Sequence, residues 1–510
     1  MELRQLLKNI QYELIDRNGN PVADGDERNR MLSIQVRQVV NDSRKVSQGC
    51  LFFCISGARS DGHAFAGAAA KAGAAVLVVE KPVAIGDGEG APVIVRVPDS
   101  RYAMALISAA FYRHPAKEMT MIGITGTKGK TTTTYMVRSM LEHAGVNTGL
   151  IGTIESTYNG KSTPSANTTP ESIVLQRTLR EMADAGVQAV VMEVSSQALK
   201  LHRVSGIEYD LAVFTNISPD HIGPNEHASF EEYMECKGRL FQQARLGIVN
   251  GDDPHTADVL RGHTCAVESF GLRPSDDLYA DHARLVKKPG ELGIAFDTEG
   301  LSHMHAEVPT PGSFSVYNAL AAIAVCLHLD VPAWQIEEAL KTVHVRGRVE
   351  MVPVSSRYTL MIDYAHNAVS LESLLTTLRE YRPHRLVTLF GCGGNRSKLR
   401  RYEMGEVSGK LSDLTIITSD NPRFEEPMDI IHDIETGMKK TDGRYVEIPD
   451  RKEAIRYAMH HAEDGDIVIL AGKGHEDYQE IKGVKHPMDE RVLIREILAE
   501  DAAADSAQTR

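Results

Sequence analysis

Short runs of apolar, often β-branched residues alternate with amphipathic segments along most of the chain. Between residues 120 and 342 this pattern predicts strands at 121–125, 148–152, 189–192, 211–215 and 247–250, each followed by a helical stretch. The alternation recurs later, with strands predicted at 360–363, 386–390, 414–418 and 467–470. Repeated strand–helix steps favour mostly parallel sheets covered by helices on both faces. The expected fold class is therefore α/β.

Two breaks in the pattern divide the chain. The first lies at residues 112–117, where Pro115 stands in a basic context, and the second at residues 345–353. An antiparallel strand excursion is predicted over residues 275–310. We therefore expect three domains, at residues 1–116, 117–346 and 347–498, with a disordered tail over 499–510 because that stretch is small and polar.

Composition narrows the class of protein. The net charge of −13 argues against a general nucleic-acid surface, although local basic pockets remain compatible with it. The six cysteines form no CxxC pair, so they are expected to be reduced thiols. Neither a signal peptide nor an apolar run of about 18 residues is visible. We expect a cytoplasmic monomer without membrane or nucleic-acid partners.

A phosphate-binding loop is predicted at residues 121–134, which read MIGITGTKGKTTTT. An apolar run leads into a glycine-rich turn and then into a helix, so that several backbone N–H groups can face one anion. Lys130 can reach terminal phosphates and the Thr131 hydroxyl can bind Mg²⁺. The strict G-x-x-x-x-G-K-T spacing fails at Ile124, and the alternative is a purely structural turn. The predicted nucleotide-binding residues are Gly126, Thr127, Lys128, Gly129, Lys130, Thr131 and Thr132.

Polar residues follow several of the predicted strands. Glu193 follows one strand, and Asn216 with the Asp220-His221 pair follows the next. A single acidic residue in this position is often only a helix cap. Several of them converging on the edge that carries the phosphate loop favour a metal and nucleotide site.

The helix predicted over residues 230–241 carries a lysine on its apolar face. The stripe runs through Phe230 and Tyr233 to Lys237 and then to Leu240, at helical spacing. The ordinary interpretation is a lysine whose ammonium group reaches past its neighbours to water. A buried lysine must instead find a partner or lose its charge, and a neutral amine can react with CO₂ to give a carbamate, an anion able to bind Mg²⁺.

Two further positions favour local structural roles when each is considered alone. Asp42-Ser43-Arg44 is typical of an Asx turn before a strand, and Asn318 is typical of a helix cap.

At the strand ends of the last domain, residues of both charges should share one edge of the sheet. They are Arg396, Asp420, Arg423 and Glu476, a combination that suits a zwitterionic ligand. A dinucleotide fingerprint beginning at Gly391 fails at Arg396.

Taken together, these segments resemble the Mur ligase family. The resemblance rests on GTKGKTT at 126–132, NTTP at 167–170, MEVSS at 192–196, Asp220-His221, Asn318, GRVE at 347–350, DYAH at 363–366, DNPR at 420–423 and GKGHE at 472–476. It extends from about residue 42 to residue 490. It implies an N-terminal UDP-binding domain, a central ATPase domain and a C-terminal Rossmann-like domain for the incoming amino acid.

The resemblance also implies roles for individual residues. Lys130, Glu193, His221 and carbamylated Lys237 would be catalytic, with Thr131 joining the last three as Mg²⁺ ligands. Nucleotide contacts would come from the phosphate loop and from Asn318, Arg348 and Asp363. UDP-N-acetylmuramoyl-L-alanyl-D-glutamate would be bound by Ser43, Asn167, Thr168, Thr169, Ser195 and Arg203. The amino acid would be bound by Arg396, Asp420, Asn421, Pro422, Arg423, Gly472 and Glu476.

The implied activity is ATP-dependent amide formation in peptidoglycan precursor synthesis, through an acyl phosphate on the D-glutamyl carboxylate. The DNPR form implies meso-diaminopimelate, whose second carboxylate Arg423 and Arg396 can bind. Three alternatives remain: a ligase of the same fold that adds L-lysine, a folylpolyglutamate-type ligase, and a regulatory NTPase with a phosphate loop. A nicotinamide-dependent oxidoreductase is less consistent with these motifs.

Overall fold

The computed structural model describes residues 1–16, 19–57, 60–85, 90–223 and 226–508. The chain divides into two units, one of residues 1–271 with 321–331 and the other of residues 272–320 with 332–510. Each unit has its own sheets and cores. Within the described residues, no helix is long and apolar enough to cross a membrane.

The first sheet of unit 1 has five strands in the order β1-β5-β4-β3-β2. All neighbours are parallel except β1, which is antiparallel to β5. Its strands are β1 (Glu13–Ile15), β2 (Gln38–Val40), β3 (Cys50–Phe53), β4 (Val76–Val79) and β5 (Val93–Arg96). The accompanying helices are α1 (Leu3–Leu6), α2 (Asp26–Leu32), α3 (Ala66–Lys71) and α4 (Ser100–Phe111).

The second sheet of unit 1 carries the phosphate loop. Its strands run in the order β13-β12-β11-β6-β10-β7-β8-β9, parallel from β13 to β7 and antiparallel after it. They are β6 (Thr120–Thr125), β7 (Thr148–Ile151), β8 (Glu155–Tyr158), β9 (Lys161–Pro164), β10 (Ala189–Glu193), β11 (Tyr209–Phe214), β12 (Ala244–Asn250) and β13 (Ala266–Gly271). The five strands predicted here are confirmed, with ends shifted by up to three residues.

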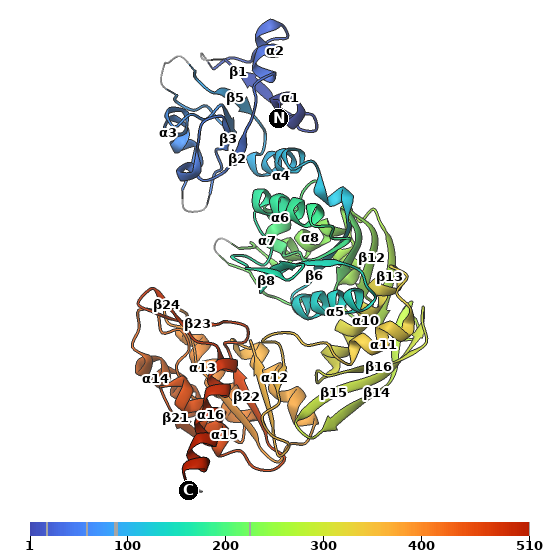
Figure 1. Ribbon diagram of the computed structural model, residues 1–510, viewed down its shortest axis with the longest axis vertical. Helices are drawn as coiled ribbons and strands as arrows, with labels where there is room; N and C mark the ends of the chain where they lie inside the picture. The colour runs from blue at the N-terminus through green and yellow to red at the C-terminus, as the bar shows by residue number, and fades with distance from the viewer. Residues whose placement is uncertain (17–18, 58–59, 86–89, 224–225, 509–510) are drawn as a thin grey trace. The chain divides into compact units, whose positions relative to one another are not determined.

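Helices cover both faces of this sheet, as expected for parallel strands buried on both sides. Helix α5 (Lys130–His143) lies on one face, whereas α6 (Ser172–Asp184) and α7 (Ser196–Lys200) lie on the other (Figure 1). Leu175 and Leu179 of α6 share a core with Met121 and Met192 of the central strands. The remaining helices are α8 (Phe230–Gly238) and α9 (Thr256–Val259). The arrangement directs the carboxyl ends of β6, β10 and β11 toward one edge.

Unit 2 contains the predicted antiparallel excursion, formed by β14 (Leu278–Lys288), β15 (Glu291–Gly300) and β16 (Met304–Val308). Its main sheet has the order β17-β18-β22-β19-β20-β21, parallel except at β17. The strands are β17 (Glu350–Val352), β18 (Thr359–Asp363), β19 (Leu386–Phe390), β20 (Leu414–Ile417), β21 (Tyr445–Glu447) and β22 (Ile467–Ala471), with a separate hairpin of β23 (Tyr478–Ile481) and β24 (Val484–Pro487).

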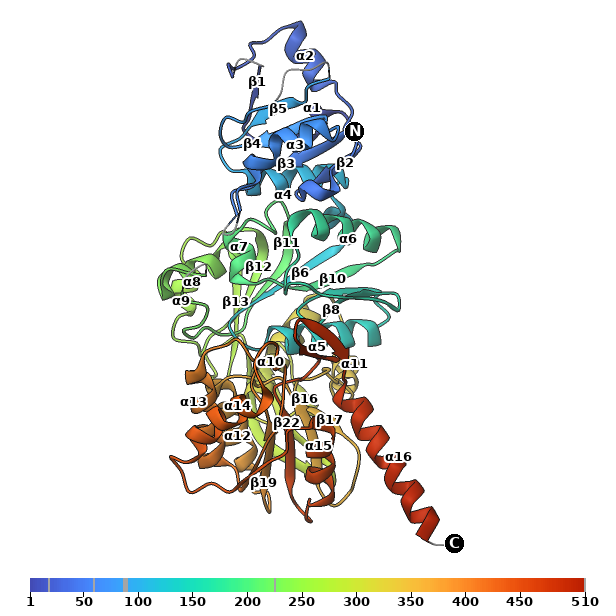
Figure 2. The same ribbon diagram turned by 90° about the vertical axis from the view of Figure 1, so that its left-hand side faces the viewer.

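Alternate residues of the central strands enter two different cores. Met361 and Ile469 pack under α12 (Ala368–Glu380), α13 (Lys398–Leu411) and α14 (Pro427–Met438). Leu360 and Val468 pack under α15 (Arg451–His460) and α16 (Glu490–Gln508) on the other face (Figure 2). The period of two along a strand explains this division, and it explains why these strands are apolar throughout. The remaining helices are α10 (Ser313–Leu327) and α11 (Ala333–Leu340).

The end of the chain differs from the expectation. A disordered tail was predicted over 499–510, but α16 continues as a helix to Gln508. Glu500 pairs with Lys452 at 2.9 Å and with Arg456 at 2.6 Å, and Asp501 lies 2.8 Å from His460. These contacts hold the extended helix against α15. Composition alone does not reveal them, because the partners lie about 40 residues earlier in the chain.

Candidate active site

The phosphate loop connects the end of β6 to the start of α5. Gly126 and Gly129 have φ values of +149° and +84°, which residues other than glycine rarely adopt. A Cβ atom on Gly126 would lie 2.0 Å from the Thr215 hydroxyl oxygen. Glycine is therefore required at this turn both for backbone conformation and for space.

Replacing Gly126 with alanine is expected to lower turnover on the order of a hundredfold, because the new methyl group displaces the loop that positions the phosphates. ATP-dependent phosphate release measures the effect. Gly145→Ala is the matched control, because Gly145 also has a positive φ, +82°, but its Cβ would meet nothing within 4 Å. Equal losses in both variants would assign the effect to backbone strain in general.

Two residues at the end of β11 support the loop from behind. Thr215 donates its hydroxyl to the Lys128 carbonyl at 2.7 Å. Asn216 donates to the same carbonyl at 3.1 Å and accepts from the Lys128 N–H at 3.0 Å. The sequence pattern placed Asn216 at this edge. Thr215 was missed, because one threonine at the end of a strand carries no distinguishing signal.

Two lysine side chains converge on the loop. Lys130 donates to the carbonyls of Gly126 at 2.8 Å and Thr127 at 2.9 Å. Lys237, on α8, donates to the same Gly126 carbonyl at 2.8 Å. Its side chain is 1% exposed and its ammonium nitrogen lies 4.4 Å from the centre of the Tyr233 ring. The interpretation of Lys237 as a solvent-reaching surface lysine is therefore wrong.

Burial sets the protonation of Lys237. Desolvation lowers the pKa of this amine well below its ordinary value, and the nearby positive charge of Lys130 lowers it further. A larger fraction of Lys237 is thus neutral at a given pH than for an exposed lysine. A neutral amine is the form that can attack CO₂.

Glu193 lies at the carboxyl end of β10 and is 1% exposed. It accepts hydrogen bonds from the Thr131 hydroxyl at 3.0 Å, the Thr153 N–H at 2.7 Å and the Thr153 hydroxyl at 3.0 Å. A carboxylate beside a threonine hydroxyl is a set of hard oxygen donors, which suits Mg²⁺. Thr153 was missed by sequence reasoning, because it becomes adjacent only when β7 pairs with β10.

Several of the residues expected to bind the muramoyl dipeptide gather beside Glu193. The Thr169 hydroxyl donates to the Glu193 carbonyl at 2.8 Å and accepts from the Ser195 N–H at 3.0 Å. Arg203 donates to the Thr169 carbonyl at 3.1 Å. The Thr168 and Thr153 hydroxyl oxygens are 3.1 Å apart. The structure thus brings Thr168, Thr169, Ser195 and Arg203 into one neighbourhood.

Other predicted site residues of unit 1 are more exposed to solvent or lie in local turns. His221 has a side chain that is 58% exposed, and its Nδ1 atom lies 3.3 Å from Glu226. Asn167 is exposed. Ser43 begins a short 3₁₀ turn whose preceding residue, Asp42, accepts from the Arg44 N–H at 3.0 Å. The Asx turn predicted there is confirmed, whereas the binding roles of these three residues remain predictions.

Among the residues of unit 2 expected to bind the nucleotide, Asn318 lies in a different position from the helix cap that its sequence context indicated. It lies inside α10 and is buried, so it is not a helix cap. Asp363 ends β18 and accepts from the backbone N–H groups of Val349 and Ala365. Desolvation raises the pKa of Asp363 despite the nearby charge of Arg348. The Arg348 guanidinium lies 4.5 Å from the centre of the Tyr364 ring.

The strand ends of the main unit 2 sheet form a buried polar cluster around Lys473, which is 0% exposed. Its ammonium group donates to Asn421 at 3.0 Å and to Glu476 at 2.8 Å, and lies 3.4 Å from Asp420. A Cβ on Gly472 would lie 3.3 Å from an Asp420 carboxylate oxygen. The sequence pattern placed Asp420 and Glu476 at this edge, and the family resemblance added Asn421 and Gly472. Lys473 was left without a role, although it stands inside GKGHE.

The two arginines predicted at this edge differ in environment. Arg423 has a φ of +53°, donates to the Gly394 carbonyl at 2.9 Å and lies 3.2 Å from Glu480. Arg396 is exposed. Pro422 packs closely against Gly394, because a Cβ atom placed on Gly394 would lie 1.9 Å from the Pro422 carbonyl oxygen. Arg423 is thus held in place, whereas Arg396 faces solvent.

His475 predicts a pH effect on the stability of unit 2. Burial, followed by the charge of Arg348, lowers the pKa of His475 from 6.5 to about 4. Between pH 6.5 and pH 4 the imidazole is therefore protonated in the unfolded chain but neutral in the folded chain. The free energy of unfolding consequently falls as the pH drops from 6.5 to 4, by at most about 3 kcal/mol. Urea unfolding across this range should show a smaller loss for His475→Gln. His486→Gln, at an exposed position of β24, should behave like the parent protein.

Comparison with known proteins identifies the family. Three family profiles match in succession: the Mur ligase family catalytic domain at residues 35–112, the Mur ligase middle domain at 124–326 and the Mur ligase glutamate ligase domain at 347–474. A UDP-N-acetylmuramoyl-L-alanyl-D-glutamate–2,6-diaminopimelate ligase of Geobacillus thermodenitrificans is 40% identical over 510 residues, covering 98% of this chain and 100% of the relative.

Solved structures agree. A structure described as a UDP-N-acetylmuramoyl-L-alanyl-D-glutamate–2,6-diaminopimelate ligase superposes with a TM-score of 0.70 at 27% identity, covering 98% of this chain and 99% of its own. The MurF ligase of Thermotoga maritima in complex with ADP shares the fold, with a TM-score of 0.56 at 19% identity over 86% of this chain and 94% of its own. Sequence and fold lead to one conclusion: the chain belongs to the Mur ligase family.

Proposed function

We propose that this chain is an ATP-dependent amide ligase that joins meso-diaminopimelate to the D-glutamyl γ-carboxylate of UDP-N-acetylmuramoyl-L-alanyl-D-glutamate, a step of peptidoglycan precursor synthesis. Full-length similarity to relatives named for that reaction supports the substrates. One structural observation carries the chemistry. Glu193 accepts from the Thr131 hydroxyl through its carboxylate and from the Thr169 hydroxyl through its backbone carbonyl, so it connects the phosphate loop to a residue expected to bind the acceptor.

The phosphate loop and the residues beside Glu193 suit phosphoryl transfer to a bound carboxylate. The N–H groups of the phosphate loop and the ammonium of Lys130 bind the ATP phosphates and offset their charge. Thr169, Ser195 and Arg203 orient the acceptor carboxylate toward the γ-phosphate. Transfer gives an acyl phosphate, the amine of the incoming amino acid attacks its carbonyl carbon, and phosphate leaves. No covalent enzyme intermediate is needed.

Mg²⁺ fits the residues present. Thr131 and Glu193 would hold one ion, and His221 with a carbamylated Lys237 would hold a second. When bound, these ions neutralise charge between the approaching carboxylate and the phosphates. The carbamate would form when the neutral Lys237 amine attacks CO₂ and loses one proton, which replaces a buried amine by a buried anion. The low pKa of Lys237 supports that step.

The binding of the amino acid follows from the charges at the unit 2 strand ends. Asp420 and Glu476 suit ammonium groups, and Arg423 suits a carboxylate. The assignment of Asn318, Arg348 and Asp363 to adenine and ribose remains part of the proposal, as does that of Ser43 to the uridine moiety.

The test is ATP-dependent phosphate release with UDP-N-acetylmuramoyl-L-alanyl-D-glutamate, run in parallel with meso-diaminopimelate and with L-lysine. Release together with tripeptide product only in the first reaction supports the proposal. Release with lysine alone would retain the ligase and reject the choice of amino acid. Phosphate release at the same rate whether or not an amino acid is present would favour a regulatory NTPase.

A further inference from the structure

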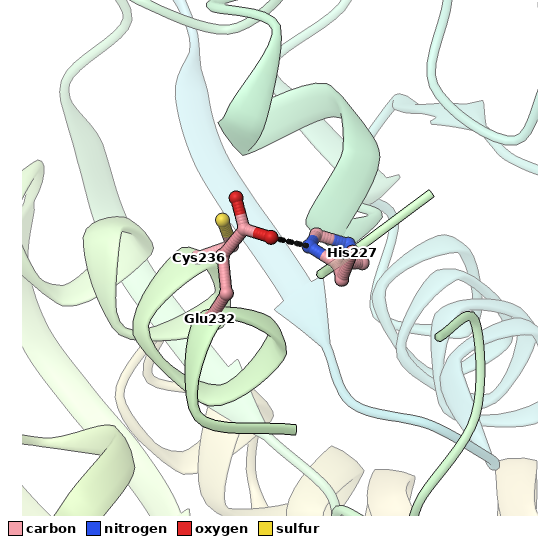
Figure 3. Close-up of side chains that lie close together, drawn as sticks. All are labelled: His227, Glu232 and Cys236. Carbon is pink, nitrogen blue, oxygen red and sulfur yellow. Dashed lines mark ion pairs between the residues drawn. The ribbon is translucent and has the colours of Figure 1, made fainter. Parts of the chain in front are cut away.

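One face of α8 carries a largely buried group of three side chains of the types that bind metal ions, and the proposed ligase reaction does not use them. They are His227, Glu232 and Cys236 (Figure 3). One ligand atom from each residue, a His227 ring nitrogen, a Glu232 carboxylate oxygen and the Cys236 Sγ, lies within 4.8 Å of the other two. These residues are distinct from Lys237, whose side chain points to the phosphate loop.

Helix geometry creates half of the group. Glu232 and Cys236 are four residues apart on α8, so they lie on the same face one turn apart. His227 comes from the segment before the helix, where its N–H donates to the His221 carbonyl at 3.0 Å and its carbonyl accepts from the Gly223 N–H at 3.0 Å. These two backbone hydrogen bonds fix the His227 backbone, so that the imidazole lies over the face of α8.

His227 provides the independent indication that a ligand belongs here. Its side chain is 1% exposed, and its Nδ1 atom has no hydrogen-bond partner among the residues that the structure describes. A Glu232 carboxylate oxygen lies 4.0 Å from this Nδ1 atom, too far for a hydrogen bond. A buried ring nitrogen without a partner is costly. A metal ion bound between these side chains would remove that cost.

The other ring nitrogen is already placed as metal sites require. His227 Nε2 lies 2.9 Å from the Ser196 hydroxyl, a buried residue at the start of α7. Ligating histidines usually use their second nitrogen in such a bond, which fixes the ring and its tautomer. Glu232 is likewise oriented, since it accepts from the Ala228 N–H at 2.6 Å and pairs with Lys200 at 2.9 Å.

We propose that His227, Glu232 and Cys236 form a Zn²⁺ site with three protein ligands, which fastens His227 onto the face of α8. Imidazole, carboxylate and thiolate together select zinc, because a soft thiolate ligand suits Zn²⁺ and not Mg²⁺. Zinc binding converts the Cys236 thiol to a thiolate, and the proton passes to solvent. A water molecule completes the fourth position. This site is independent of the proposed ligase chemistry.

The test uses Co²⁺ as a spectroscopic probe on chelator-treated full-length protein. Titration should produce sulfur-to-cobalt charge-transfer absorption that saturates at about one equivalent and is abolished by excess Zn²⁺ but not by excess Mg²⁺. Cys236→Ala should lack the band. Cys265→Ala, which removes a buried cysteine elsewhere in unit 1, should retain it. Absence of the band in the parent protein, or its survival in Cys236→Ala, would overturn the site.

A second variant avoids dependence on the folding of Cys236→Ala. Ser196→Ala keeps all three ligands and removes only the partner of the second ring nitrogen, so Co²⁺ affinity should fall by about 10–100-fold. Zn²⁺ should also raise the Tm of the parent protein and of Cys265→Ala, because it binds the folded state. An unchanged affinity in Ser196→Ala together with no Zn²⁺-dependent rise in Tm would reject the proposal.

Discussion

Replacing Lys237 with methionine is expected to lower ligase turnover on the order of a thousandfold, while leaving the fold intact. Methionine fills most of the volume of the buried side chain, so no large cavity is left. It cannot bond to the Gly126 carbonyl, where Lys237 donates at 2.8 Å, and it cannot carry a carbamate. Phosphate release with both substrates present measures the loss.

The controls separate the carbamate from the amine. Lys161→Met changes an exposed lysine of β9 and should keep full turnover. In Lys237→Ala, acetate should restore part of the activity if a carboxylate is needed, whereas methylammonium should restore it if the charge of the amine is needed. ¹³C-bicarbonate should give a carbamate resonance in the parent protein that both Lys237 variants lack. Near-normal turnover in Lys237→Met would contradict the assignment.

Arg423→Ala is expected to reduce kcat/KM for meso-diaminopimelate about a thousandfold while changing the value for L-lysine little. The reason is that diaminopimelate carries a second carboxylate, and removing the half-buried Arg423 leaves that carboxylate without a hydrogen-bonded counterion. L-Lysine lacks this group. The quantity to measure is the ratio of kcat/KM for the two amino acids.

Arg423 also has structural contacts, to the Gly394 carbonyl and to Glu480, so a conservative variant is needed. Arg423→Lys keeps one positive charge but loses the planar fork, and it should fall between the parent protein and Arg423→Ala. Arg495→Ala, at an exposed position of α16, should leave the ratio unchanged. Equal losses for both amino acids in Arg423→Ala would indicate that Arg423 only supports the fold.

Local sequence patterns were sufficient for several features of the fold and site. The spacing of apolar residues predicted the central strands, because periods of two and 3.6 are properties of the backbone itself. The turn at Gly126 was predictable because only glycine tolerates it. The place of Lys237 in the apolar stripe of one helix raised burial as an alternative to a solvent-reaching lysine, and the structure decided between the two.

Other features depend on which strands become neighbours. Glu193 meets Thr153 because β10 pairs with β7, and Lys237 reaches Gly126 across 111 residues of sequence. No local period encodes such a pairing, since the order of strands in a sheet is a choice among many topologies. The same holds for the bond between Lys473 and Asn421, which are 52 residues apart in the sequence.

The sequence by itself thus determined the α/β class, the phosphate loop and the edges at which polar residues collect, because each is encoded within a few consecutive residues. Only the tertiary structure decided the protonation of Lys237, the partners of Glu193 and the meeting of His227 with Glu232 and Cys236. Those depend on desolvation and on distances between side chains, and both are properties of the packed chain rather than of any local segment.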